Sequence, residues 1–259
     1  MTAHRRNPEP RRWQRRAQPA LGTLVEIGIS GTDARCEESM LAAFAEIAQV
    51  QRCMSRFDPA SDVSRFAALR AGESMQVAAR TAQVLCAAQD LADLSKGLFD
   101  VTQGRAPAGW RCDADGRLFK LHDAAVFDLG GIAKGYAVDA AVRVLQERDS
   151  LGGWVNAGGD VRAFGAVRLP LWLRDEREGR VWPFARLEDG AFSTSWYGDG
   201  SRSELWQAPQ PGSSPAFAAH VSVAAPQCLW ADALTKIVAA SGDAGHPLLA
   251  RFGAQAWLH

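Results

Sequence analysis

The stretch of residues 128–139 reads D-L-G-G-I-A-K-G-Y-A-V-D and holds the clearest structural signal in the chain. An apolar run, residues 124–127, precedes it, and an amphipathic run, residues 133–145, follows it. This order predicts a strand, a tight turn at Gly130 and Gly131, and a helix. Glycines lack Cβ atoms and let backbone N–H groups approach an anion, and a helix N-terminus favours negative charge. The stretch therefore predicts a phosphate site.

The glycine spacing separates this turn from two common phosphate motifs. A P-loop requires G-x-x-x-x-G-K-[ST], and a dinucleotide-binding turn requires G-x-G-x-x-G. Neither pattern is met here. Lys134 instead places a positive side chain at the predicted helix start, which favours an anion by a different arrangement.

The bulk composition bounds the class of protein. The chain has 259 residues, 47% of them hydrophobic, which suffices for one large domain or two intimate lobes. Its 29 Lys and Arg residues balance 29 Asp and Glu residues, which argues against a nucleic-acid-binding face. No apolar run reaches the length of about 18 residues that a membrane span needs, so we predict none.

Arginine is concentrated at the N-terminus, beside Pro8 and Pro10. We predict a disordered basic tail over residues 1–19 and a folded domain over residues 20–259. No apolar segment follows the arginines, as a secretory signal would require. The five cysteines are scattered and odd in number, which argues against a disulfide framework and favours a cytoplasmic location.

Hydrophobic periodicity predicts the other elements. Apolar residues from Met40 to Met54 recur at helical spacing, in a long helix with Thr32 or Asp33 as N-cap. After residues 133–145 the pattern changes to short strand-like runs, followed by one last helix. Strands and helices thus segregate, which predicts an α+β fold. The further expected elements are strands at 24–29, 154–155, 161–164, 168–173, 181–187 and 220–224, helices at 78–94 and 230–241, and loops at 55–64, 103–117 and 199–216.

Two further segments end apolar runs with small or polar residues. Residues 156–160 read N-A-G-G-D, where Gly158 and Gly159 form either a hairpin turn or a place of close approach to a ligand. Residues 193–195 read S-T-S and are either a polar strand end or a set of donors to phosphate or ribose.

Asp232 lies in the first turn of the last predicted helix. Its carboxylate either compensates the helix dipole or binds a hard cation. Magnesium is usually held by one or two carboxylates together with substrate phosphates. A carboxylate beside a glycine-rich phosphate turn meets that requirement.

A series of ordered segments together resembles the FAD:protein FMN transferase family, also called ApbE. The resemblance runs along the chain from residue 20, and residues 128–139 match the family pattern letter for letter. The matching segments also include L-G-T at 21–23, the loop from Met54 to Ser64, S-K-G-L-F-D at 95–100, N-A-G-G-D at 156–160, S-T-S at 193–195, S-V-A-A at 222–225 and A-D-A-L at 231–234.

The resemblance implies an ApbE-like α+β fold of two intimate lobes with a ligand cleft between them. It implies FAD in that cleft and Mg²⁺ on the pyrophosphate. The implied reaction moves FMN from FAD onto a threonine hydroxyl of an acceptor protein and releases AMP. This is phosphoryl transfer, in which fixed donors and a cation stabilise charge on the phosphoryl oxygens.

The resemblance also assigns residues to the site. Asp232 is expected to be the carboxylate ligand of Mg²⁺ and part of the catalytic apparatus, with Thr235 and a carbonyl of the turn at Gly131 as further metal ligands. Phe57 takes the position of an aromatic that stacks on the flavin, and its alternative role is a core anchor. The residues expected to bind FAD are Phe57, Gly130, Gly131, Lys134, Asn156, Gly158, Gly159, Ser193 and Thr194.

The chain departs from the family pattern at three places. The family histidine that is a candidate general base is absent, and Glu204 is the expected substitute, with His220 as its alternative. The metal-binding threonine of the family stands four residues after the aspartate, where this chain has Lys236. A lysine there can neutralise phosphate directly and weaken the need for Mg²⁺. The segment before the glycine turn is also short.

These departures leave two alternatives to transfer. One is an FAD-binding protein on the same scaffold that no longer transfers FMN. The other is an FAD pyrophosphatase, which needs a water molecule but no acceptor protein.

Overall fold

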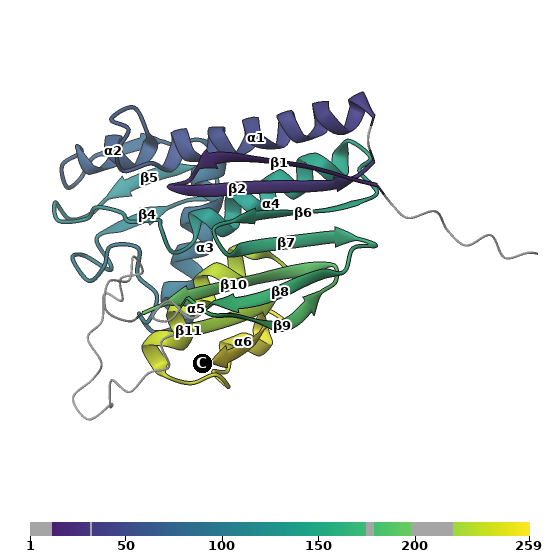
Figure 1. The fold of residues 1–259 in the computed structure, drawn as a ribbon. Helices are drawn as coiled ribbons and strands as arrows, with labels where there is room; N and C mark the ends of the chain where they lie inside the picture. Colours follow the sequence, from purple (N-terminus) through teal and green to yellow (C-terminus); the bar gives the residue numbers. More distant parts are fainter. Residues whose placement is uncertain (1–11, 32, 175–178, 198–219) are drawn as a thin grey trace, which may run out of the picture.

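The computed structural model describes residues 12–31, 33–174, 179–197 and 220–259. A seven-stranded antiparallel sheet forms the centre of the fold, with the strand order β1-β2-β6-β7-β10-β11-β12 (Figure 1). Its strands are β1 (Trp13–Ala20), β2 (Thr23–Ser30), β6 (Gly152–Ala157), β7 (Asp160–Gly165), β10 (Gly190–Trp196), β11 (His220–Ala225) and β12 (Gln255–Leu258).

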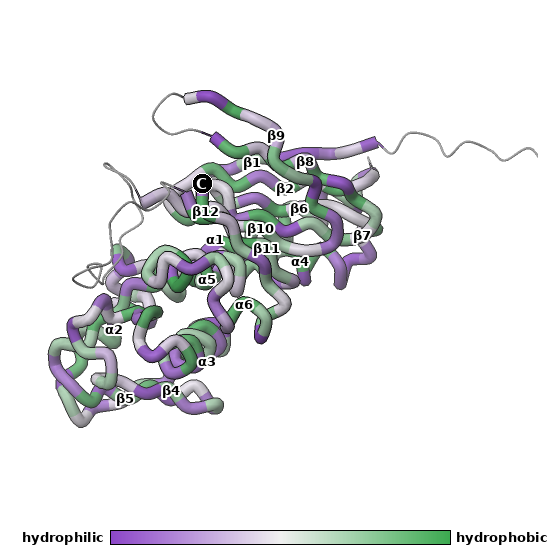
Figure 2. Tube along the Cα trace, turned by 90° about the horizontal axis from the view of Figure 1, so that it is seen from below, coloured by the Kyte–Doolittle hydropathy of each residue, from purple (hydrophilic) through white to green (hydrophobic). Residues whose placement is uncertain are grey.

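Three long helices cover one face of this sheet (Figure 2). They are α1 (Ala34–Met54), α4 (Ala133–Glu147) and α5 (Cys228–Ser241). Alternate residues of β2, among them Val25 and Ile27, are fully buried in the same hydrophobic cluster as the helices. This alternation is what a strand with one covered face requires.

A hairpin lies on the opposite face of the sheet, formed by β8 (Leu169–Arg174) and β9 (Val181–Leu187) (Figure 2). Its apolar residues, such as Leu171, pack with Trp154 and Phe192 in a second, smaller cluster. The sheet is thus covered on both faces, by helices on one and by this hairpin on the other.

A smaller lobe completes the fold, built on a three-stranded sheet in the order β3-β5-β4. One continuous cluster of buried residues includes Phe66 and Leu85 of this lobe as well as Val155 of the large sheet. The α+β class and the intimate packing of the lobes are as predicted. The elements not yet named are α2 (Asp62–Ala67), β3 (Ser74–Gln76), α3 (Ala79–Leu94), β4 (Trp110–Cys112), β5 (Arg117–Lys120) and α6 (Leu248–Arg251).

The predicted N-cap at the start of α1 is confirmed. Asp33 is the N-cap of α1, and its side chain accepts a hydrogen bond of 3.0 Å from the backbone N–H of Cys36. All five cysteines are free. Among the described residues, no helix combines the length and the apolar character that crossing a membrane would take.

The predicted N-terminal tail is wrong over its second half, because Trp13–Ala20 forms β1 and pairs with β2 along its whole length. An edge strand tolerates the arginines that suggested disorder, and also Pro19, since its open side faces solvent. Arg15, for example, pairs with Glu26 across the two strands. Residues 1–11 lie outside the described part of the chain.

The strand predicted at residues 124–127 is absent. Phe127 is buried instead by aromatic contacts, stacked on Phe66 at 4.3 Å and edge-on to Trp110 at 4.9 Å between ring centroids. The apolar run therefore marks burial rather than sheet pairing. The loop expected at residues 103–117 likewise contains β4 and the start of β5.

Candidate functional site

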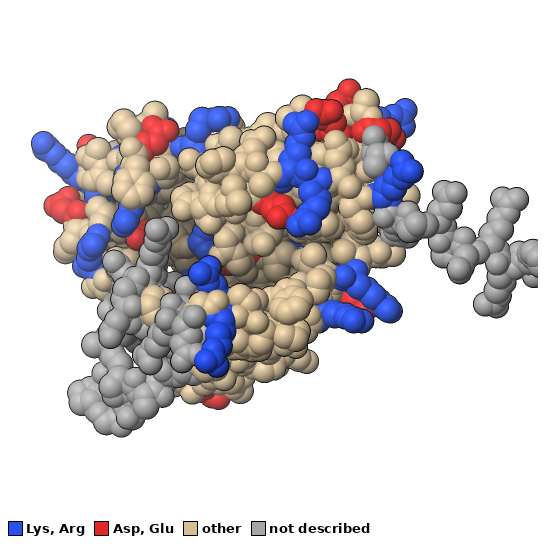
Figure 3. Space-filling view, in the orientation of Figure 1, with Lys and Arg blue, Asp and Glu red and all other residues tan. Residues whose placement is uncertain are grey.

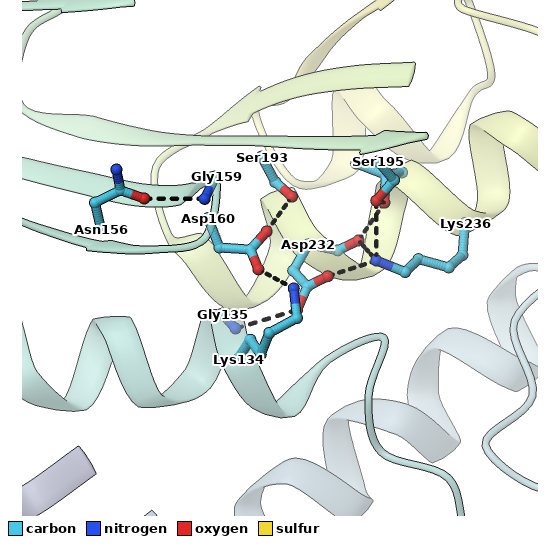
Figure 4. Close-up of polar contacts among 10 residues, drawn as sticks. Lys134, Gly135, Asn156, Gly159, Asp160, Ser193, Ser195, Asp232 and Lys236 are labelled. Carbon is cyan, nitrogen blue, oxygen red and sulfur yellow. Dashed lines mark hydrogen bonds and ion pairs between the residues drawn. The ribbon is translucent and has the colours of Figure 1, made fainter. Parts of the chain in front are cut away.

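The N-terminal end of α4 meets the N-terminal half of α5 and the strands β7 and β10 (Figure 4). The space-filling view in Figure 3 shows this face of the molecule hollowed near its centre, between the part that carries α1 and β1 and the part that carries β10 and β11. Of the residues predicted for the site, Lys134, Ser193, Thr194, Asp232 and Thr235 come from these elements.

The doubled glycine before α4 makes a compact turn without left-handed backbone conformations. The N–H of Gly130 donates to Asp128 Oδ1 at 2.8 Å. A Cβ on Gly131 would lie 3.0 Å from Cε of Lys236, a residue of α5. Close approach to α5, rather than an unusual φ angle, therefore explains the absence of a side chain at residue 131.

A third glycine of the stretch fixes the contact between the two helices more tightly. A Cβ on Gly135 would lie 2.3 Å from the carbonyl oxygen of Cys228 and 2.9 Å from Cβ of Asp232. The N–H of Gly135 donates to Asp232 Oδ2 at 3.1 Å. The glycine turn and the C-terminal aspartate thus converge in space, as the sequence interpretation required.

Lys134 extends from the start of α4 to strand β7, where its ammonium forms an ion pair with Asp160 (Figure 4). Asp160 is buried and accepts a second hydrogen bond, of 2.5 Å, from Ser193 Oγ of β10. Burial and the charge of Asp232 raise the pKa of Asp160 above its ordinary value. Burial alone would lower the pKa of Lys134, but Asp232 and Asp160 outweigh it and raise that pKa, so Lys134 stays charged.

Asp232 is fully buried, and both of its carboxylate oxygens are engaged. Oδ2 accepts from the N–H of Gly135, and Oδ1 accepts from Lys236 Nζ at 2.5 Å. Burial alone would raise the pKa of Asp232, but the ammonium groups of Lys236 and Lys134 outweigh it and hold that pKa below its ordinary value. The same pairing raises the pKa of Lys236 against the effect of its own burial.

The three hydroxyls of residues 193–195 do not act together. Ser193 and Ser195 face the charged cluster, which consists of Lys134, Asp160, Asp232 and Lys236. Ser195 Oγ lies 3.0 Å from Thr235 Oγ1 and 3.3 Å from Lys236 Nζ. The alternation of the strand turns Thr194 to the other face, where its hydroxyl lies 2.9 Å from Ser222 Oγ. Thr194 was predicted to bind FAD, but the structure places its hydroxyl on the opposite face of the sheet from the charged cluster.

The hairpin interpretation of residues 156–160 is confirmed. Gly158 and Gly159 form the two-residue turn between β6 and β7, with φ of +65° and +105°. Asn156 Oδ1 accepts from the N–H of Gly159 at 3.0 Å and fixes the turn. A Cβ on Gly158 would lie 2.4 Å from Thr23 Oγ1, whereas Gly159 has nothing closer than 3.9 Å. The open side of this turn is therefore at Gly159.

Phe57 is not a core anchor, because 82% of it is exposed. The guanidinium of Arg56 lies over its ring at 5.0 Å and also pairs with Asp128 at 2.9 Å. The other carboxylate oxygen of Asp128, Oδ1, accepts a hydrogen bond from the N–H of Gly130. The loop that presents the Phe57 ring is thus tied to the glycine turn, and most of the residue remains exposed.

Asp139 is a site-forming residue that the sequence interpretation missed. Its carboxylate accepts hydrogen bonds from the backbone N–H groups of Cys228 and Leu229, at 2.9 and 2.8 Å, and pairs with Arg162 at 2.6 Å. It therefore caps α5 from the side of α4, where the N-cap residue of α5 provides no side-chain bond. Asp139 is the last residue of the 128–139 stretch, and this position was the sign in the sequence that it could belong to the site.

The predicted Mg²⁺ ligands do not fit a metal as they lie in this structure. Each carboxylate oxygen of Asp232 already has a partner, Gly135 or Lys236, and the Thr235 hydroxyl donates to the main-chain oxygen of Asp232 at 2.7 Å. Within the described ranges, no group of three or more His, Cys, Asp or Glu residues could hold a metal ion. The predicted base, Glu204, lies outside the described residues.

Solved structures of other proteins share this fold. The flavinyl transferase ApbE of Pseudomonas stutzeri superposes with a TM-score of 0.81 at 23% identity, covering 98% of this chain and 92% of its own. The ApbE protein of Thermotoga maritima gives 0.80 at 24% identity, covering 95% and 94%. The flavin transferase ApbE of Vibrio cholerae gives 0.79 at 20% identity, covering 96% and 94%. The fold is therefore that of ApbE proteins.

The sequence itself matches the model of the ApbE family over residues 21–127 and 113–258, so the chain belongs to the ApbE family. A curated relative, the FAD:protein FMN transferase of Rhodobacter capsulatus, is 29% identical over 202 residues, which is 65% of this chain. The aligned part spans 39% of that relative's own length.

Proposed function

We propose that this protein is an FAD:protein FMN transferase, which moves FMN from FAD to a threonine hydroxyl of an acceptor protein and releases AMP. The observation that carries the proposal is the convergence of the glycine turn with α5. The N–H of Gly135 donates a hydrogen bond to Asp232 Oδ2, and the turn at Gly131 packs against the side chain of Lys236. Family membership and the name of the curated relative support the same activity.

The site offers separate places for the parts of FAD. The N-terminal end of α4 favours the pyrophosphate, and the two ammonium groups of Lys134 and Lys236 face the same region. The exposed ring of Phe57 offers a flat apolar face to the isoalloxazine. Gly130, Gly159 and Asn156 are proposed to line the ligand through the two turns that they form.

The proposed chemistry is a substitution at phosphorus. The threonine oxygen of the acceptor forms a bond to the phosphorus of the FMN half, and the bridging P–O bond to the AMP half breaks. The electron pair of that bond leaves with AMP, and the hydroxyl proton passes to a base, for which Glu204 remains the prediction. Fixed ammonium groups near the phosphoryl oxygens stabilise the charge that develops on them.

The Mg²⁺ expected from the resemblance is not part of this proposal. Two of the ligands predicted for it, Asp232 and Thr235, are engaged in protein contacts, and Lys236 Nζ lies against Asp232 Oδ1. We therefore derive the electrostatic part of the reaction from the lysines alone. The five free thiols support the further proposal that the protein works in a reducing, cytoplasmic compartment.

One experiment tests the activity against its alternatives. The protein is incubated with FAD and a threonine-bearing acceptor peptide, and the peptide is then examined for a fluorescent covalent adduct while AMP is measured. We expect adduct and AMP in equal amounts. AMP without adduct would identify a pyrophosphatase, and bound FAD without AMP would identify a binding protein.

A further inference from the structure

Lys236 Nζ lies within reach of three oxygen atoms of different kinds (Figure 4). They are the carboxylate Oδ1 of Asp232 at 2.5 Å, the main-chain oxygen of Asp232 at 3.1 Å and Ser195 Oγ at 3.3 Å. A carboxylate, a carbonyl and a hydroxyl are the oxygen donors that hard cations take in proteins. The ammonium therefore lies where these oxygens would otherwise surround a metal ion.

The lysine is held in this position by its surroundings. Its aliphatic stem lies against the glycine turn, since a Cβ on Gly131 would meet three of its carbons, the nearest at 3.0 Å. The side chain is only 16% exposed, and the Asp232 side chain is fully buried. A lysine packed in this way keeps its charge beside the carboxylate without first having to be ordered by a ligand.

The charges of the cluster argue against a metal ion beside this ammonium. Two ammonium groups, of Lys134 and Lys236, face two carboxylates, of Asp160 and Asp232, and each carboxylate is already in an ion pair. A divalent cation at Asp232 would have to displace the ammonium or lie next to it, and like charges in a buried site repel strongly.

We propose that the ammonium of Lys236 takes the place of a divalent cation at the pyrophosphate, so that this protein binds FAD and transfers FMN without Mg²⁺. The binding of FAD in this statement rests on the proposed function. In the substitution at phosphorus, Lys236 acts as a fixed point charge toward the phosphoryl oxygens. Lys134 supplies a second such charge from the start of α4.

The first test measures Mg²⁺ binding on the protein without FAD, by the shift of its melting temperature. Wild type is expected to show no Mg²⁺-dependent rise. Lys236→Thr removes the ammonium, leaves the charge of Asp232 unpaired and adds a hydroxyl, so it is expected to gain a rise that increases with Mg²⁺ concentration. A second substitution, Asp232→Asn in the Lys236→Thr background, should abolish the gain.

Lys236→Met is the matched control, because it keeps the length of the stem and provides neither charge nor oxygen ligand. It is expected to show no Mg²⁺ response. A Mg²⁺-dependent rise in wild type, or its absence in a folded Lys236→Thr protein, would overturn the proposal. Should Lys236→Thr not fold, the wild-type measurement alone still decides, because stabilisation by Mg²⁺ there contradicts an occupied cation site.

The second test measures FAD binding by flavin fluorescence in EDTA and in Mg²⁺. Wild type is expected to bind FAD equally in both. Lys236→Met should bind about tenfold more weakly in both, which corresponds to the loss of a charged hydrogen-bond donor. Lys236→Thr should be weak in EDTA and recover in Mg²⁺. FAD binding by wild type that fails in EDTA would contradict the proposal.

These tests separate the inference from the proposed function. The melting-temperature series uses neither FAD nor acceptor, so it judges the replacement of the metal even where no covalent adduct forms. An absent adduct with the expected melting behaviour would remove the transferase activity and leave the cation replacement standing.

Discussion

Gly135→Ala is the substitution for which the structure predicts the largest effect from the smallest chemical change. Gly135 is the third residue of α4, where alanine would ordinarily stabilise the helix by about 1 kcal/mol. Here the added methyl would lie 2.3 Å from the carbonyl oxygen and 2.7 Å from the carbonyl carbon of Cys228, both backbone atoms of α5. These atoms cannot rotate away, so the two helices must separate.

The magnitude follows from these opposing effects. Overpacking in a dense core costs about 3 kcal/mol at the upper end of its usual range, and the helix preference returns about 1 kcal/mol. The net loss of about 2 kcal/mol corresponds to a fall in melting temperature of about 4–8 °C for a chain of this size. Differential scanning calorimetry measures this fall directly.

The matched control is Gly190→Ala in β10, where the nearest atom to a new Cβ is 3.5 Å away, an ordinary contact distance. We expect its stability to stay within about 0.5 kcal/mol of wild type. A Gly135→Ala protein that melts at or above the wild-type temperature would refute the reasoning, because the helices would then have room that the structure denies them.

Three further predictions concern other residues. Asp139→Ala removes the cap of α5 and leaves Arg162 unpaired, so chemical denaturation should record a loss of about 3 kcal/mol, whereas a loss below about 1 kcal/mol would contradict the role of Asp139. Phe57→Ala should leave the melting temperature unchanged and weaken FAD binding about fivefold in a fluorescence titration, and unchanged affinity would remove the stacking role. Arg80 lowers the pKa of Glu46 below 4.5, so this pair contributes stability above pH 4.5 that is lost as the pH falls through the folded-state pKa. In a plot of melting temperature against pH, Glu46→Gln should therefore lose less stability than wild type as the pH falls. If the two curves ran parallel, the Glu46–Arg80 pair would not be the cause of the loss at low pH.

Local chemistry explains which parts of the fold could be predicted. The N-cap at Asp33 and the turn at Gly158 depend on neighbouring residues alone, and both were found from the sequence. The strand Trp13–Ala20 depends on a partner strand, and its arginines indicated only their preference for water. The apolar run at residues 124–127 showed burial correctly, but burial does not distinguish a strand from an aromatic contact.

The candidate site also has parts that could be predicted from the sequence and parts that could not. The resemblance brought together residues that are far apart in the sequence, and the structure places Lys134 and Asp232 in one cluster. The resemblance could not show that Lys236 forms an ion pair with Asp232. That contact depends on side-chain rotamers and on the packing of the lysine stem against Gly131. The direction of the Thr194 side chain, toward the opposite face of the sheet from Ser193 and Ser195, follows from the strand register, which the sequence does not specify.

The bond between Gly135 and Asp232 joins residues 97 positions apart, and Asp139 reaches Leu229 over 90. Contacts between such distant segments form late in folding, because a long loop must close before they contribute any stability. The cluster of Lys134, Asp160, Asp232 and Lys236 should therefore assemble only once the last helix docks. A chain that ends before Cys228 would carry the whole 128–139 stretch and still lack half of this cluster.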